Sequence, residues 1–160
     1  MAKVIQSQQQ VVVEPWWGKA NIVFIGLGLG LVWWILTSIL KAYVVEPLAC
    51  RDLATATACV DSFGIAGSIA AIAVVILGVL ILIKALQPRP IVIALATGVL
   101  LWDLGAFVNG LSWWETLLWA LFFYGASYVL FQFAARVNST AWSLVLAAII
   151  VIVIRLLLIL

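Results

Sequence analysis

The chain has 160 residues, of which 68% are hydrophobic and 9% are charged, and its net charge is +2. A typical soluble chain carries about 25% charged residues, so this composition excludes a water-soluble globular protein. The small net charge and the absence of a basic run exclude nucleic-acid binding. The absence of histidine removes haem ligation, imidazole acid–base chemistry and most transition-metal sites.

Apolar stretches separated by short polar breaks predict an all-α, polytopic transmembrane bundle. About 20 apolar residues span a hydrocarbon core of roughly 30 Å. Neighbouring spans joined by such short breaks must be antiparallel and adjacent, so residues 20–160 are expected to form one bundle. The alternative has four spans, with one of the last two segments re-entrant or interfacial. The five predicted spans are about 20–45, 62–86, 91–110, 112–136 and 141–160.

Residues 1–19, which precede the first span, are expected to be a tail lying on the membrane. They lack the order of a cleavable signal peptide, so the first span should stay in the mature protein. Tryptophan prefers the membrane–water interface, which makes Trp16 and Trp17 beside Lys19 candidate headgroup anchors. The other predicted interfacial anchors are Trp113, Trp114 and Trp142.

The largest polar break is residues 46–61, and it is expected to begin where Glu46 and Pro47 stop the first helix. It contains the only two cysteines, Cys50 and Cys59, and we predict a structural disulfide between them. Closing so short a ring should stabilise the fold by about 2–3 kcal/mol. A redox-active pair usually has C-x-x-C spacing, which is missing, and a two-cysteine metal site would need further ligands.

Small residues recur at helical spacing in the first two spans and predict helix-packing faces. Helices in lipid associate through close backbone contact, which glycine and other small residues allow. Whether these faces meet each other or a partner protein is left open by the sequence. The positions are Gly26 and Gly30 in the first span, and Gly64, Gly67, Ser68 and Ala71 in the second.

Asp103 and Arg155 are charged residues inside predicted spans. An ionised side chain near the bilayer centre costs at least about 2.5–3.5 kcal/mol, so such charges are usually paired or functional. Asp103 lies about 18 Å along its span from Ile91, and Arg155 about 19.5 Å along its span from Trp142. Because both spans run in the same direction, we predict that the two side chains face the bundle interior and form an ion pair.

The fourth span has a start signal in the sequence. Ser112 is followed three residues later by Glu115, which is the pattern of a capping box. A helix is therefore expected to begin at Ser112.

The distribution of charge predicts an N-inside, C-outside orientation, because cytoplasmic breaks carry an excess of Lys and Arg. Loop 46–61 would then lie on the non-cytoplasmic side of a bacterial inner membrane or an equivalent membrane. The predicted inside holds one anion, Glu14, and the cations Lys3, Lys19, Lys84, Arg89 and Arg136. The predicted outside holds Lys41 and Arg51 with the anions Glu46, Asp52, Asp61 and Glu115.

The residues favour an interaction protein over an enzyme. No metal cluster, cofactor motif or nucleophile–base pairing can be argued from their positions, so we expect no catalytic centre, no metal and no cofactor. The leading hypothesis is an accessory, assembly or structural subunit that contacts the lipid bilayer and either other membrane subunits or further copies of itself. The alternative is a small channel or permease that uses Asp103 and Arg155, although matching halves and broken helices of the transporter kind are not evident.

Overall fold

The computed structural model describes residues 16–50, 59, 61–87, 89–136 and 139–159, and the secondary structure of this part of the chain is helical, without strands. The all-α prediction is therefore confirmed for the described residues. In chain order the elements are α1 (Trp16–Leu40), the π-helix η1 (Lys41–Val45), α2 (Glu46–Ala49), α4 (Ser62–Lys84), α5 (Pro90–Leu100), α6 (Leu104–Phe107), α7 (Trp113–Ala135) and α8 (Thr140–Ile159).

Four helical segments of the described chain are long and apolar enough to cross a membrane. They are Asn21–Leu48, Ser62–Lys84, Pro90–Phe107 and Trp113–Ala135. The apolar part of α8 for which side chains are described, Ala141–Leu156, is shorter. The chain thus has the helices of a membrane-embedded protein, while the fifth span stays a prediction.

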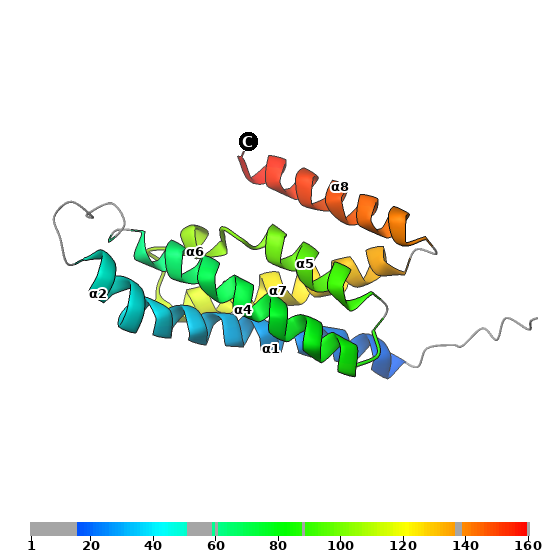
Figure 1. Ribbon diagram of the computed structural model, residues 1–160, viewed down its shortest axis with the longest axis horizontal. Helices are drawn as coiled ribbons and strands as arrows, with labels where there is room; N and C mark the ends of the chain where they lie inside the picture. The colour runs from blue at the N-terminus through cyan, green and yellow to red at the C-terminus, as the bar shows by residue number, and fades with distance from the viewer. Residues whose placement is uncertain (1–15, 51–58, 60, 88, 137–138, 160) are drawn as a thin grey trace, which may run out of the picture.

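The long helices lie side by side and alternate in direction along the chain, and α8 lies at the edge of the group (Figure 1). We call the end where α4 and α7 finish and α5 and α8 begin the Arg89 end. The opposite end, with α2, the start of α4, α6 and the start of α7, is called the Cys50 end. α1, α4, α5–α6 and α7 form a four-helix core, and α8 packs beside it on α5 and α7.

The first helix continues past the residues expected to stop it. The sequence predicted an end at Glu46 and Pro47, but η1 and α2 extend the helix to Ala49, so that prediction was wrong. Proline collides with the preceding turn inside a regular helix but is tolerated in a first turn. Pro47 occupies one of the first two positions of α2, directly after the wider turns of η1, and this placement lets the helix continue.

The third predicted span is broken, which the sequence did not lead us to expect. α5 ends at Leu100, and α6 begins at Leu104 after a turn that contains Asp103. Aspartate is a poor residue for a helix interior and a preferred one immediately before a helix. Asp103 stands at that position before α6, although its side chain makes no capping hydrogen bond there, so it is its low preference for a helix interior that agrees with the break.

The capping box at the start of α7 is confirmed. Ser112 donates from its backbone N–H to Glu115 Oε2 at 2.9 Å, and its hydroxyl donates to the same oxygen at 2.7 Å. α7 then runs from Trp113 to Ala135, close to the predicted 112–136.

The core is built on contacts that only small residues permit. A Cβ atom added to Gly30 would lie 2.8 Å from the carbonyl oxygen of Ala120, and one added to Gly26 would lie 3.0 Å from Cα of Gly125. α1 and α7 therefore touch through their backbones. Gly26 and Gly30, which the sequence assigned to packing, meet α7 of the same chain.

A second close contact joins α4 to α6. A Cβ atom on Gly105 would lie 2.9 Å from the carbonyl oxygen of Phe63 and 3.2 Å from Cα of both Gly64 and Gly67. Next to it, the indole N–H of Trp33 in α1 donates to the carbonyl oxygen of Gly67 at 3.0 Å. Trp33 is fully buried, so this bond ties α1 to α4 inside the core. Ala71, the last of the predicted packing residues, is also buried.

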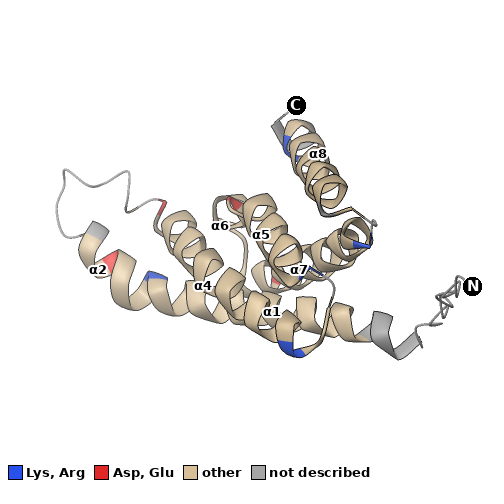
Figure 2. Cartoon of the chain, turned by 45° about the vertical axis from the view of Figure 1, so that its right-hand side comes forward, with Lys and Arg blue, Asp and Glu red and all other residues tan. Residues whose placement is uncertain are grey.

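Charged residues gather at the helix ends and at the break, and the long helices between them are otherwise uncharged (Figure 2). The described cations of the Arg89 end are Lys84, Arg89 and Arg136, and no acidic residue is described there. The Cys50 end holds Lys41 with Glu46, Asp61 and Glu115. This sorting agrees with the pattern on which the predicted orientation was based, and the sidedness itself stays a prediction.

Candidate functional site

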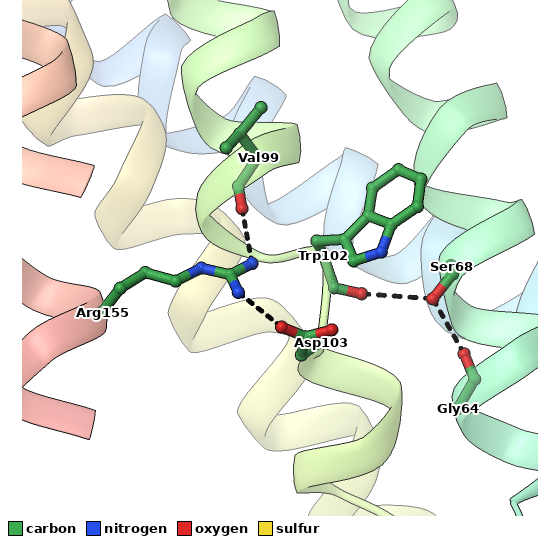
Figure 3. Close-up of polar contacts among 6 residues, drawn as sticks. All are labelled: Gly64, Ser68, Val99, Trp102, Asp103 and Arg155. Carbon is green, nitrogen blue, oxygen red and sulfur yellow. Dashed lines mark hydrogen bonds and ion pairs between the residues drawn. The ribbon is translucent and has the colours of Figure 1, made fainter. Parts of the chain in front are cut away.

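The break between α5 and α6 brings together the two intramembrane charges. Figure 3 shows Arg155 reaching from α8 to Asp103 in the turn after α5. Arg155 Nη1 donates to Asp103 Oδ2 at 2.5 Å. The predicted partners therefore do contact each other.

The same guanidinium also donates a hydrogen bond to the C-terminal end of α5. Arg155 Nη2 donates to the carbonyl oxygen of Val99 at 2.8 Å. The last carbonyls of a helix lack partners within it and carry partial negative charge. Arg155 therefore pairs with the charge of Asp103 through Nη1 and donates through Nη2 to a carbonyl of the last turn of α5.

A hydroxyl of α4 lies on the other side of the break. Ser68 Oγ is 3.1 Å from the carbonyl oxygen of Gly64 and 3.4 Å from that of Trp102, and its single proton can go to either (Figure 3). Ser68 was predicted only as a packing residue. Its contact with the turn was missed, because the carbonyl of Trp102 becomes available only when the third span is broken.

The prediction that the ion pair faces the bundle interior was wrong. The side chain of Asp103 is 63% exposed and that of Arg155 is 34% exposed. The reason is the place of α8, which lies outside the four-helix core instead of completing it. The pair consequently forms on the flank of the core, where Arg155 reaches inward from a peripheral helix.

An apolar pocket of about 400 Å³ opens beside the ion pair. Its size lies within the range of about 300–1,000 Å³ found for small-molecule sites. α5, α6, α7, α8 and the turn at the break all contribute to it, so no periodicity within one segment could have revealed it. The lining residues are Leu100, Leu101, Asp103, Leu104, Ala106, Phe107, Phe123 and Arg155.

α8 is held to the rest of the chain along one stripe. Ser143 and Ala147 are 0% and 4% exposed, and Val151 and Arg155 continue the stripe at four-residue steps and are half-buried. Such spacing keeps side chains on one face of a helix. The other side chains described on this helix are mostly exposed, so within Ala141–Leu156 the attachment is a narrow stripe that runs from Ser143 to the ion pair.

The predicted disulfide joins Cys50 to Cys59, with the two Cα atoms 4.9 Å apart. Residues 51–58, between the cysteines, lie outside the described part of the chain. The bridge connects the end of α2 to the chain just before α4. It lies at the Cys50 end, away from the pocket.

The predicted interfacial tryptophans divide into two groups. Trp113, Trp114 and Trp142 are 69%, 50% and 67% exposed, as residues facing lipid headgroups should be. Trp16 and Trp17 begin α1, but their side chains lie outside the described residues. Anchoring by all five stays a prediction.

In comparison with known proteins, no family model, curated protein or solved structure matches this chain.

Proposed function

We propose that this protein is a non-enzymatic integral membrane subunit that helps assemble a larger membrane complex. The observation that carries the proposal is the narrow attachment of α8. Between Ser143 and Arg155 the helix touches the core along one narrow stripe, so most of its described side chains are available to another helix.

One exposed edge of α8 lines an open apolar groove together with α5. Leu144, Ala148 and Ile152 follow one another at four-residue steps, and all are exposed. Association there would rest on shape and van der Waals contact, because lipid tails are as apolar as these side chains. The partner would be another membrane subunit or a second copy of this chain.

The proposed topology has five spans, with the N-terminus inside and the C-terminus outside. The cations of the Arg89 end support a cytoplasmic location for that end. The disulfide supports an oxidising compartment for the Cys50 end. A bacterial inner membrane or an equivalent membrane would supply both conditions.

The test is purification of the full chain from its native membrane in mild detergent after crosslinking from α8. A photoreactive residue at Ala148 should capture a partner at fixed stoichiometry, while one at Ala73, on the exposed face of α4, serves as the matched control. Equal capture from both positions, or a monomer without partners, would contradict the proposal.

The second candidate function is a small channel or permease. The specific observation in its favour is the broken helix, because transporters place discontinuous helices and paired charges at their binding sites. Flux through vesicles containing the purified protein, abolished by Asp103→Asn while the protein stays assembled, would support this function over the first.

A further inference from the structure

The ion pair leaves much of its hydrogen-bonding capacity unused. A guanidinium has five N–H donors, and the described contacts of Arg155 with Asp103 and Val99 use two. A carboxylate can accept about four hydrogen bonds, and Asp103 is 63% exposed. A polar group of either sign that approached the pair from outside would therefore find a partner.

The position of the pair along its span places it within reach of the membrane surface. Asp103 is 13 residues beyond Pro90, the first residue of α5, which corresponds to about 19.5 Å at 1.5 Å per residue. A hydrocarbon core is roughly 30 Å thick. With Pro90 at the opposite surface, the pair lies about 10 Å from the surface at the Cys50 end, so a bound lipid headgroup has to reach down to it along the flank of the core.

The pocket supplies the apolar half of a binding site at the same place. Leu104, Phe107 and Phe123 line it next to Asp103 and Arg155. Phe107 and Phe123 meet edge to face with their centroids 5.9 Å apart, so they form a fixed wall. An acyl chain fits such a surface, while the charges at its edge suit the head of the same molecule.

We propose that this pocket binds one zwitterionic phospholipid with a primary ammonium headgroup. Its phosphate would accept hydrogen bonds from Arg155, its ammonium would donate to Asp103, and an acyl chain would lie in the pocket. Charge complementarity favours this lipid, because the site presents one cation and one anion side by side. An anionic lipid would satisfy Arg155 alone, and a quaternary ammonium has no N–H to give to Asp103.

The test compares phosphatidylethanolamine, phosphatidylcholine and phosphatidylglycerol with identical acyl chains. The full chain in mild detergent is mixed with equal amounts of the three, and lipid-bound protein is measured by intact mass. A hydrogen bond to a charged group should give phosphatidylethanolamine a roughly tenfold preference over phosphatidylcholine. Equal retention of these two lipids would overturn the proposal.

Two variants test separately the ion pair that would bind the lipid headgroup and the pocket that would bind its acyl chain. Asp103→Asn should remove the preference for phosphatidylethanolamine over phosphatidylcholine. Ala106→Trp, which leaves the ion pair in place and fills the pocket, should reduce retention of the lipid, whereas Ala73→Trp on the exposed face of α4 should not. Unchanged retention in Ala106→Trp would overturn the proposal even if Asp103→Asn failed to fold. So would a preference for phosphatidylglycerol that Asp103→Asn leaves intact, because Arg155 would then bind alone.

Discussion

The contact between α1 and α7 differs from the attachment of α8 in how each helix is held. Gly26 and Gly30 bring α1 against the backbone of α7, so that added side-chain atoms would collide with main-chain atoms. α8 instead touches its neighbours along one stripe, from Ser143 to the ion pair of Arg155 with Asp103. Since water expulsion does not drive helix association in lipid, the first contact depends on shape and the second depends in part on charge.

From this difference we expect α1 and α7 to stay together as a rigid unit and α8 to be the more easily displaced helix. A glycine contact cannot loosen gradually, because the backbones either fit or do not. An ion pair on an exposed flank can exchange its partners for lipid headgroups or for another protein. The two proposals made above both draw on this second region.

Gly30→Leu should have the largest effect on the stability of the core. The new side chain would meet the carbonyl of Ala120, and overpacking of this kind costs about 3 kcal/mol of unfolding free energy. Gly28→Leu is the matched control, because a Cβ atom there meets nothing within 4 Å. Unfolding in mixed detergent micelles measures both. Similar losses for the two variants would show that α1 and α7 do not pack through glycine.

Removal of the disulfide should have the next largest effect. Cys50→Ser with Cys59→Ser frees the end of α2 from the start of α4, and the ring should contribute about 2–3 kcal/mol. The same unfolding measurement, made on the wild type with and without reductant, provides the control. If reductant did not change the wild-type midpoint, the bridge would not stabilise the packed region.

Trp33→Phe should lower the unfolding free energy by less, about 1–2 kcal/mol. The substitution removes the indole donor to the carbonyl of Gly67 but keeps an aromatic ring in the core. The half-buried neighbour Trp34 offers the comparison, and Trp34→Phe should change the unfolding free energy less. The reverse order would mean that the bond from α1 to α4 does not stabilise the core.

Arg155→Gln should have the smallest effect on the core and a clear effect on α8. The pair lies on the flank of the four-helix core and not inside it, so we expect little change in the unfolding free energy of the core. Spin labels on α8 and α5 should show a broader distance distribution in the variant. Lys84→Gln, which removes an exposed cation at the other end, is the control.

The double variant Asp103→Asn with Arg155→Gln sharpens the last comparison. If the two residues act as a pair, the distance distribution between spin labels on α8 and α5 should be no broader in the double variant than in Arg155→Gln alone. Additive effects would show that the two charges act on α8 independently.

Much of the helical layout could be predicted from the sequence. α4 and α7 lie close to their predicted ranges, and the start of α7 follows from Ser112 and Glu115, because a capping box depends on residues within one turn. The contact of Asp103 with Arg155 also agrees with the prediction, since helical rise fixes the relative level of two residues on parallel spans.

Other features could not be predicted because they depend on neighbours far along the chain. The passage of the first helix through Pro47 depends on a π-helical turn that no residue pattern in this segment predicted. The exposure of Asp103 depends on where α8 packs. The pocket depends on side chains from helices separated by up to 55 residues, from Leu100 to Arg155.

Helices suited to a membrane could be recognised before the fold was known, because span length, hydropathy and capping are properties of contiguous residues. The folded arrangement was needed to learn that the third of these helices breaks at Asp103, that α8 stays outside the core, and that a pocket forms between them. Those outcomes depend on contacts between segments far apart in the sequence, such as that of Arg155 with Asp103, and no single segment encodes them.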